Sequence, residues 1–353
     1  MFEATYPPPV IGGKEKQAHL LSRELVRLGV KVTVLSYTHN GNTSGEHEGV
    51  LVDRVPRGLA ALPLLFWHLM RYRSKFSILH IHTPSRIGKI VTIFGFLLRY
   101  KVVFKFPNEH LLDNSGFIEP ASWKIILNLV DLFVVLEDDT RRKLIERNVP
   151  IEKIFQVSNG VEILDNPSDQ KDDKLFKTLF VGRLMPQKKC DDLIKACSLL
   201  DKKKIDWKLI IVGDGPLYKE LMGLCNKLGV ADRVFFEGYQ ADTLSYMKKS
   251  DLLVLPSKKE GMSNVLLEAM SVGLSIIATK VGAARIQVGY MGEQFLYEVG
   301  DIKTLVKHIE KMGNDHNLRY SYGDYLRVRC RDEFSIEMIS CLYLEKYRNI
   351  ILS

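Results

Sequence analysis

Two glutamates, Glu260 and Glu268, lie eight positions apart in a stretch whose pattern predicts a strand, a polar turn, a helix and a second strand. The preceding run SDLLVLPS is typical of a parallel strand that is buried on both faces. Ser263 and Asn264 are preferred N-cap residues, and Gly273 stands where a helix would end. We therefore expect Glu260 in the loop and Glu268 on the helix.

This arrangement favours phosphate as a ligand. A helix that begins at the carboxyl end of a parallel strand points its unbonded N–H groups and its positive dipole end at whatever lies there. The alternative is that both glutamates are solvated charges flanking an ordinary strand-turn-helix, because two glutamates at one spacing often occur by chance.

The same stretch resembles the donor-sugar motif of the retaining glycosyltransferases of family 4. That motif is a Glu-Gly pair, variable residues, and a second Glu within LEAM, and Glu260 and Glu268 match it letter for letter. The resemblance implies that Glu260 contacts the donor sugar and that Glu268 contacts the ribose of the nucleotide.

A second match is the run GRL with a lysine four residues later, here Arg183 and Lys188. A diphosphate leaving group gains negative charge as the glycosidic bond breaks, so fixed cations stabilise that transition state. Arg183 can bind two oxygens at once, and Lys188 adds a point charge. The resemblance thus assigns the chemistry to Glu260, Arg183 and Lys188, whereas without it the two cations are ordinary surface charges of a basic protein.

The resemblance also implies a wider donor site. Besides Glu268, it includes the first Gly-Gly loop, the turn after a strand ending at Val212, and the start of the helix that carries Glu268. These positions are Gly12, Gly13, Gly213, Asp214, Gly215, Ser263, Asn264 and Val265. The Gly-Asp-Gly turn alone is a weak signal, and we expect it only to line the base.

Two departures from the family concern the acceptor side. The family commonly has a histidine after a strand in the first domain, where this chain reads VVFKFP, and His110 comes three residues late. His80 and His82 are neighbouring candidates, although two residues apart on a strand they point the same way and form an ordinary polar strand end in the alternative reading. We take His82 and His110 as candidate acceptor-side residues. A family glutamate is replaced by Ile286.

Composition places the chain among soluble globular proteins. Its 353 residues suffice for two domains, 46% are hydrophobic and 26% are charged, and no apolar run reaches the ~18 residues of a membrane span. The start lacks a signal-peptide pattern, and five cysteines without metal-like spacing favour a reducing compartment and no zinc site. We expect a cytoplasmic protein without a metal cofactor.

The net charge of +8 is unevenly distributed, because no acidic residue stands between Asp53 and Glu109. Ten cations fall there: Arg54, Arg57, Arg71, Arg73, Lys75, Arg86, Lys89, Arg99, Lys101 and Lys105. Apolar runs interleave with them, as expected of a protein face that contacts the cytoplasmic side of an anionic membrane. The alternative is two amphipathic helices with their apolar faces in the core. Binding of nucleic acid is disfavoured, because no binding module is recognisable.

Strand and helix patterns alternate through both halves, which predicts an α/β fold of parallel sheets with crossover helices. The resemblance implies two doubly wound Rossmann-like domains facing each other across a cleft, the GT-B architecture. We predict an N-terminal acceptor-side domain over 1–165, a nucleotide-sugar-binding domain over 166–333, and a C-terminal helix over 334–353 that crosses back to the first domain.

Almost no strand precedes Gly12 and Gly13, although the first strand of such a domain is usually central. We therefore expect that roughly ten residues, a strand and a short lead, are missing before Met1. The neighbouring strands should then have unpaired edges.

The function implied is metal-independent, retaining transfer of a hexose or N-acetylhexosamine. The donor would be a UDP- or GDP-sugar, and the acceptor a glycan or lipid-linked molecule in cell-surface polysaccharide synthesis. A catalytically silent relative that binds a nucleotide sugar or a partner enzyme is the alternative, because the family histidine is missing and the first strand is short. An epimerase or phosphorylase of the same fold is disfavoured by the order of the motifs.

Overall fold

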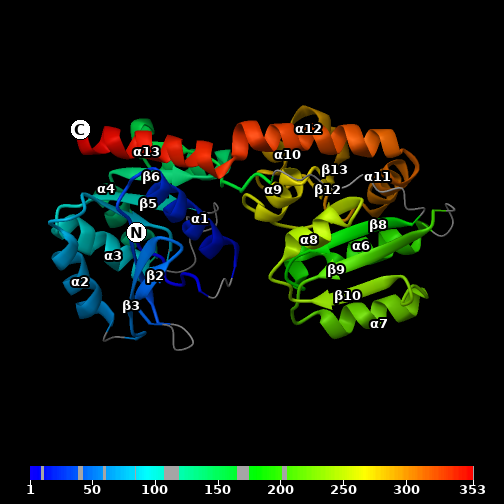
Figure 1. The fold of residues 1–353 in the computed structure, drawn as a ribbon, viewed down its shortest axis with the longest axis horizontal. Helices are drawn as coiled ribbons and strands as arrows, with labels where there is room; N and C mark the ends of the chain where they lie inside the picture. The colour runs from blue at the N-terminus through cyan, green and yellow to red at the C-terminus, as the bar shows by residue number, and fades with distance from the viewer. Residues whose placement is uncertain are drawn as a thin grey trace. The chain divides into compact units, whose positions relative to one another are not determined.

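The computed structural model describes residues 1–8, 12–38, 43–58, 61–83, 85–106, 119–164, 175–200 and 205–352. These form two compact units (Figure 1). Unit 1 comprises Met1–Gly160 and Ile336–Ser353, and unit 2 comprises Val161–Ser335. The boundary predicted at residue 165 lies outside the described residues, so the predicted domain limits stay a prediction.

Unit 2 is built on a six-stranded sheet with the order β10-β9-β8-β11-β12-β13, and every neighbouring pair is parallel. Its strands are β8 (Phe176–Val181), β9 (Trp207–Val212), β10 (Val234–Gly238), β11 (Leu252–Leu255), β12 (Ser275–Thr279) and β13 (Leu296–Tyr297). All residues of β11 and β12 are buried, which explains their continuous apolar runs.

The strand order of unit 2 reverses between β8 and β11. From β8 the chain adds β9 and β10 on one side, and then returns to place β11, β12 and β13 on the other. Ligands of doubly wound folds bind at the carboxyl ends of the strands beside such a switch point. The loops that follow β8 and β11 are therefore the ones to inspect.

Helices alternate with the strands of unit 2. They are α6 (Cys190–Ser198), α7 (Tyr218–Leu228), α8 (Thr243–Lys248), α9 (Asn264–Ser271), α10 (Ala284–Gly292), α11 (Ile302–Asn314) and α12 (His316–Phe334), with short 3-10 turns η3 (Pro186–Lys188) and η5 (Glu293–Phe295).

Unit 1 contains a four-stranded parallel sheet in the order β4-β5-β6-β7 and a three-stranded sheet in the order β1-β3-β2. The strands are β1 (Thr33–Tyr37), β2 (Gly45–His47), β3 (Val50–Val55), β4 (Ile78–Ile81), β5 (Lys101–Phe106), β6 (Leu132–Val135) and β7 (Ile154–Gln156). Only β2 and β3 pair antiparallel among the described strands.

Residues at the start of the chain join the two sheets of unit 1. Phe2 pairs in parallel with both Leu35 of β1 and Ile81 of β4. Met1 O accepts from Leu35 N at 2.8 Å, and Phe2 N donates to His80 O at 2.8 Å. The expectation of unpaired edges on both neighbours was wrong, because these few residues already bond to each side.

The helices of unit 1 cover both faces of its sheet. They are α1 (Gly13–Arg27), α2 (Ala61–Tyr72), α3 (Arg86–Leu97), α4 (Glu119–Leu129), α5 (Asp138–Glu146), the turn η2 (Ile151–Lys153) and α13 (Ile336–Leu352). One core joins α1, α13 and the sheet through Leu21, Val134 and Tyr343. The other joins the sheet to α2, α3 and α4. The last helix, red in Figure 1, thus lies beside the first.

The predicted α/β class with two Rossmann-like units is confirmed. The sequence patterns did not predict β2, β3, α10, α12 or β13. No helix in the described part of the chain has both the length and the apolar character that crossing a membrane requires.

Candidate active site

The loop after β8 passes very close to the turn after β9. A Cβ added at Gly213 would lie 2.0 Å from Gly182 O, and one added at Gly215 would lie 2.5 Å from Leu184 O. Only glycine fits at these two positions, and Gly213 also has a φ of +139°. Arg183 lies between Gly182 and Leu184, the two residues approached in this way, and is exposed.

Glu260, in the loop after β11, is held by two donors. Lys188 Nζ donates to Glu260 Oε1 at 2.5 Å, and Ser257 Oγ donates to the same oxygen at 2.6 Å. Ser257 is in turn fixed through its carbonyl, which accepts from Thr279 Oγ1 at 2.6 Å. The side chains of Lys188 and Glu260 are 21% and 13% exposed, so the pair lies at the surface of the sheet edge rather than inside the core.

Further bonds join the same two loops. Lys258 N donates to Gln187 O at 2.8 Å, and Gln187 Nε2 donates to Lys259 O at 2.7 Å. The loops on the two sides of the switch point are thereby cross-linked through backbone and side chain. The relative position of Lys188 and Glu260 is set by these bonds as well as by their own ion pair.

Helix α9 begins as its sequence predicts. Ser263 is the N-cap, and its side chain accepts from Leu266 N at 3.4 Å. The fully buried Gln287 fixes the cap: Ser263 N donates to Gln287 Oε1 at 3.1 Å, and Gln287 Nε2 donates to Ser263 O at 2.8 Å. Asn264 and Val265 form the first turn and are half-buried. The first N–H groups of α9 are therefore held in place.

Glu268 lies in the middle of α9 and is 7% exposed. Its Oε2 accepts from Thr243 Oγ1, at the start of α8, at 3.1 Å. Glu260 and Glu268 thus come from one loop-helix segment, as the spacing predicted, while Asp214 is exposed after β9 and accepts from Gly215 N at 2.7 Å.

This edge of unit 2 can bind a ligand that carries both an anionic group and hydroxyl groups. Within the described residues Arg183 makes no ion pair, and Lys188 forms only the bond to Glu260, which leaves two ammonium N–H groups. Glu260 Oε2 accepts no bond from any described residue, so it can accept from a hydroxyl of a ligand.

Gly12 and Gly13 belong to unit 1 rather than to unit 2. Gly12 precedes α1 with extended backbone and Gly13 is its first residue. A Cβ at Gly12 would lie 2.9 Å from Glu15 Oε2, the end of a flexible side chain. Their predicted contact with a donor remains a prediction.

Of the acceptor-side candidates, His110 lies outside the described residues. His82 is 4% exposed and its ring centroid lies 4.0 Å from that of His80, so the two rings point the same way. His80 Nδ1 is 2.5 Å from Tyr347 OH of α13. Burial lowers the pKa of both histidines well below the ordinary value, so both are neutral near pH 7.

Sequence reasoning missed a buried polar cluster beside these histidines. Lys105 Nζ donates to Asn159 Oδ1 at 3.0 Å, and Thr83 Oγ1 donates to Glu3 Oε1 at 2.6 Å. Burial lowers the pKa of Lys105 to about 8 and raises that of Glu3 to about 7. A lysine within the otherwise apolar run VVFKF was the available signal.

Comparison with known families decides the affiliation. The model of the glycosyl transferases group 1 matches residues 163–329, and that of glycosyltransferase family 4 matches residues 11–163. The chain belongs to the glycosyltransferases of family 4. The family-level expectation from Glu260, Glu268, Arg183 and Lys188 is thus confirmed, while the roles of the individual residues stay predictions.

Relatives of this family 4 chain match it over different shares of their length. It is 31% identical over 173 residues to N-acetyl-alpha-D-glucosaminyl L-malate synthase of Bacillus anthracis, which covers 49% of this chain and 45% of that protein. It is 27% identical over 303 residues to the capsular polysaccharide biosynthesis glycosyltransferase CapM of Staphylococcus aureus, 78% of this chain and 77% of CapM. The first match spans less than half of that relative.

A solved structure agrees over nearly the full length. The crystal structure of HepE of Anabaena in complex with UDP and glucose superposes with a TM-score of 0.80 at 20% identity, covering 98% of each chain. This likeness supports the family 4 fold of two Rossmann-like units.

Proposed function

We propose that this protein is a metal-independent, retaining glycosyltransferase that moves a hexose or N-acetylhexosamine from a nucleotide-diphosphate sugar to a glycan or lipid-linked acceptor. The observation that supports it best is the pairing of Lys188 with Glu260 at the switch point of unit 2, with Arg183 exposed in the same loop as Lys188. Cations and a carboxylate meet there at the ends of β8 and β11, where doubly wound folds bind nucleotides.

In the proposed reaction the bond between the anomeric carbon and the diphosphate oxygen breaks, and a bond from that carbon to the acceptor oxygen forms on the same face. The acceptor proton passes to the departing diphosphate. Arg183 and the two remaining N–H groups of Lys188 stabilise the charge that develops on the diphosphate. Glu260 Oε2 accepts from a sugar hydroxyl and orients the ring, and Glu268 binds the ribose.

The names of two relatives support the proposed donor class. The name of the Bacillus anthracis relative specifies an N-acetyl-alpha-D-glucosaminyl group, and HepE was crystallised with UDP and glucose. UDP is therefore the nucleotide to test first, with GDP as its comparison. CapM is named for capsular polysaccharide synthesis, which supports a cell-surface glycan as the product.

The decisive experiment follows the fate of labelled donors. Three proteins are incubated with UDP-glucose, UDP-N-acetylglucosamine and GDP-mannose: wild type, Glu260→Gln and the control Glu298→Gln. Glu298 is an exposed glutamate directly after β13. We expect hydrolysis or transfer of a UDP-sugar by wild type and the control, with retained anomeric configuration in the product, and strong loss in Glu260→Gln. Binding without any turnover in wild type would support the silent relative instead, and inversion would contradict the mechanism.

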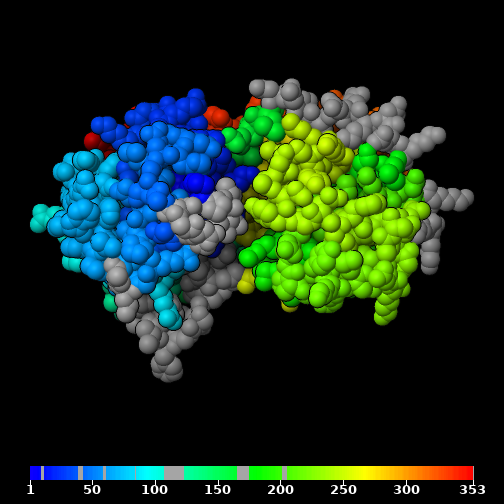
Figure 2. Space-filling model, turned by 60° about the horizontal axis from the view of Figure 1, so that its bottom comes forward, coloured from blue at the N-terminus to red at the C-terminus, as the bar shows by residue number. Residues whose placement is uncertain are grey.

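We also propose that unit 1 rests on the cytoplasmic face of an anionic membrane through α2 and α3, which pack against each other. Six large apolar side chains on these helices are exposed: Leu64, Trp67, Met70, Ile93, Phe96 and Leu97. The guanidinium of Arg71 lies 5.5 Å from the centroid of the Trp67 ring. The light-blue segment that includes α2 covers one side of this unit in Figure 2.

Two of the basic residues in this segment are too buried to contact a membrane. Lys89 is buried with its ammonium 4.1 Å from the Trp123 ring centroid, and Lys105 is buried against Asn159. Neither can meet a membrane. Arg71, Arg73, Lys75, Arg86 and Arg99 are exposed and remain available.

Flotation with vesicles tests the membrane contact. Wild type should float with phosphatidylglycerol-containing vesicles at low salt, and less at high salt, because the attraction is screened. A Trp67→Ser, Phe96→Ser variant should lose binding, whereas Tyr239→Ser, an exposed aromatic of unit 2, should not. If wild type does not float at low salt, the membrane contact is contradicted. The alternative then remains, in which this segment forms amphipathic helices whose apolar faces pack in the core.

A further inference from the structure

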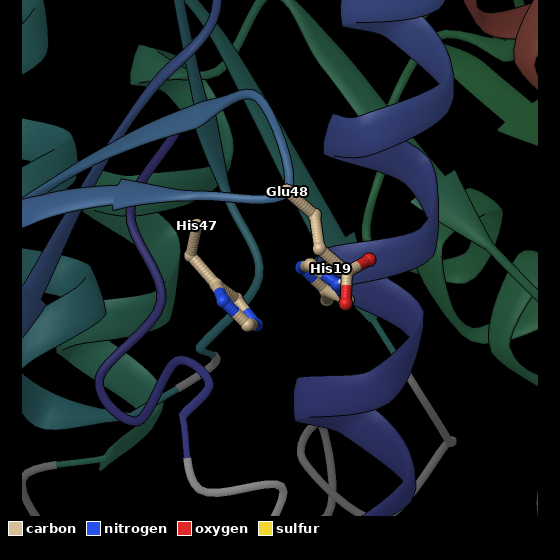
Figure 3. Close-up of side chains that lie close together, drawn as sticks. All are labelled: His19, His47 and Glu48. Atoms are coloured by element: carbon tan, nitrogen blue, oxygen red, sulfur yellow. Dashed lines mark hydrogen bonds and ion pairs between the residues drawn. The ribbon is translucent and has the colours of Figure 1, made fainter.

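The β2–β3 hairpin brings His47 and Glu48 against His19 of α1 (Figure 3). One ligand atom from each of the three side chains lies within 4.8 Å of the others. The rings of His19 and His47 are stacked, with centroids 4.9 Å apart and planes at 25°. His19 is buried, His47 is half-buried and Glu48 is exposed, so the cluster opens to solvent at the hairpin.

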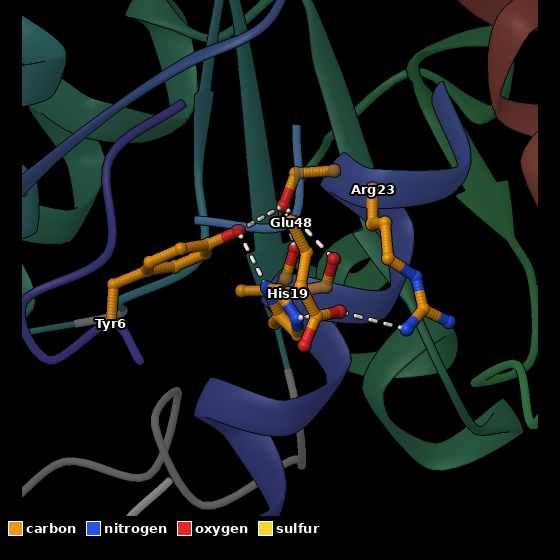
Figure 4. A network of polar contacts seen from close by, with 6 residues as sticks. Tyr6, His19, Arg23 and Glu48 are labelled. Carbon is orange, nitrogen blue, oxygen red and sulfur yellow. Dashed lines mark hydrogen bonds and ion pairs between the residues drawn. The ribbon is translucent and has the colours of Figure 1, made fainter. Parts of the chain in front are cut away.

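Hydrogen bonds behind His19 decide which of its nitrogens faces Glu48 (Figure 4). Ser22 Oγ donates to Ala18 O at 2.6 Å, because a carbonyl oxygen can only accept. Ser22 therefore accepts from Tyr6 OH, 2.7 Å away, and Tyr6 in turn accepts from His19 Nδ1 at 3.0 Å. The proton of a neutral His19 ring is thus on Nδ1.

The other nitrogen of His19 then presents a lone pair to a carboxylate. Nε2 lies 3.1 Å from Glu48 Oε2. Two electron-rich atoms at this distance repel each other unless a positive charge lies between them. Arg23 Nη1 donates to the same Oε2 at 3.0 Å, so one positive charge already lies beside the carboxylate. A cation bound by both Nε2 and the carboxylate would remove the repulsion directly.

The backbone conformation of the hairpin also draws attention to Glu48. Glu48 and Gly49 form its two-residue turn with φ values of 49° and 80°. Turns with two positive φ values favour Asn, Asp or Gly at the first position, and another residue there costs roughly 1–2 kcal/mol. A glutamate kept at a strained position is a reason to look for a role of its side chain.

We propose that His19 Nε2, one ring nitrogen of His47 and the Glu48 carboxylate bind one divalent transition-metal ion that fastens the β2–β3 hairpin to α1. Two imidazoles and a carboxylate suit Zn²⁺ and its neighbours in the first transition row. The bond from His19 Nδ1–H to Tyr6 is the outer contact that ligating histidines usually make.

The geometry requires only a small adjustment. Metal–ligand bonds of about 2.0–2.2 Å place the ligand atoms of a tetrahedral site roughly 3.3 Å apart. The pair from His19 and Glu48 already meets this separation. The half-buried His47 ring has to approach by a side-chain rotation, and a water molecule would complete the coordination. The proposed sugar transfer takes no step through this ion.

Zinc binding by the whole chain tests the proposal. Protein treated with a chelator and kept reduced is titrated with Zn²⁺ in competition with a fluorescent zinc indicator. We expect His47→Ala and Glu48→Gln to weaken the tightest site at least about tenfold, and His316→Ala, which removes an exposed histidine of α12, to leave it unchanged. Equal affinity of wild type and His47→Ala would overturn the proposal.

Two further measurements separate a metal site from an ion-pair network. Zn²⁺ should raise the melting temperature of wild type but not of His47→Ala, and Co²⁺ should give strong four-coordinate visible absorption only in wild type. Arg23→Gln frees Glu48 Oε2 and should keep or increase the affinity. If Arg23→Gln instead loses as much affinity as His47→Ala, the ion pair organises the cluster and the ligand assignment is wrong.

Discussion

The carboxyl edges of the two parallel sheets carry similar residues in opposite environments. In unit 2, Lys188 and Glu260 form a partly exposed ion pair with Arg183 outside it. In unit 1, Lys105 is buried against Asn159, and Glu3 is buried against Thr83. One architecture therefore presents its charges to solvent in one unit and encloses them in the other.

Exposure decides what each set of charges can do. At the edge of unit 2 the ions can exchange partners with a ligand, because water lowers the cost of separating them. In unit 1 burial penalises the charged forms, so the pKa of Glu3 rises to about 7 and that of Lys105 falls to about 8. We expect ligand binding to depend on the first set and pH-dependent stability on the second.

The largest expected effect is on nucleotide binding by unit 2. An Arg183→Ala, Lys188→Ala variant should lose about 4 kcal/mol of UDP affinity, because the diphosphate would lose both cations. Calorimetric titration measures this loss. The matched control is Lys208→Ala, Arg233→Ala, which removes the same charge at the amino ends of β9 and β10. Equal UDP affinity of wild type and the first variant would contradict the diphosphate assignment.

The second effect concerns the stability of unit 1. Burial raises the pKa of Glu3 to about 7 from an ordinary value of 4.5, so the folded unit holds a proton that the unfolded chain has released between these pH values. This contribution is complete below pH 4.5 and is lost as the pH rises to about 7, a fall of about 3 kcal/mol.

Replacing Glu3 by Gln should remove that fall, whereas Glu345→Gln, on the exposed side of α13, should keep it. Denaturant unfolding is followed by tryptophan fluorescence in a Trp207→Phe background, where only Trp67 and Trp123 of unit 1 report. Parallel stability curves for wild type and Glu3→Gln between pH 4.5 and 7 would show that Glu3 is not the titrating group.

Local sequence rules predicted much of unit 2. The strand predicted to end at Val212 does end there, as β9, and Ser263 caps α9 as its residue type indicates. Such elements depend on neighbours in the chain, so a single sequence contains the information. Contacts between loops do not depend on neighbours in the chain, because the order of the strands in the sheet sets them. The bond of Lys188 to Glu260 and the role of Ser257 therefore required the structure.

Unit 1 was harder to predict for physical reasons. Its β2–β3 hairpin turns at Glu48-Gly49, and glutamate is not a residue that marks such turns. The strand position taken by Phe2 and its neighbours is too short to show a periodic pattern. The burial of Lys105 follows from packing of α13 against the sheet, a contact between the two ends of the sequence.

A third, smaller effect tests how closely the loops of unit 2 must approach. Gly213→Ala should lower the free energy of unfolding by about 2 kcal/mol, because the new methyl would lie 2.0 Å from Gly182 O and φ is +139°. Gly223→Ala in α7 adds a methyl to open space and should stabilise by about 0.5–1 kcal/mol. Thermal unfolding measures both. Similar melting temperatures for the two variants would contradict the close contact.

The smallest expected effect distinguishes orientation of the sugar by Glu260 from binding of the nucleotide by Arg183 and Lys188. Ser257 donates to the Glu260 oxygen that also accepts from Lys188, so Ser257→Ala leaves the ion pair intact but removes one of the two bonds that orient the carboxylate. A hydrogen bond to a charged group contributes about 1.5 kcal/mol. If Glu260 orients the sugar rather than the nucleotide, kcat should fall roughly tenfold while UDP affinity stays constant.

Two controls make this outcome specific. Ser275→Ala removes a hydroxyl that donates to Arg319 O inside unit 2, away from the proposed site, and should change neither quantity. Ser257→Thr keeps a donor at the same position and should restore part of kcat. A parallel loss of UDP affinity and kcat in Ser257→Ala would mean that the loop after β11 holds the nucleotide as well. The separation of roles between Glu260 and the two cations would then be wrong.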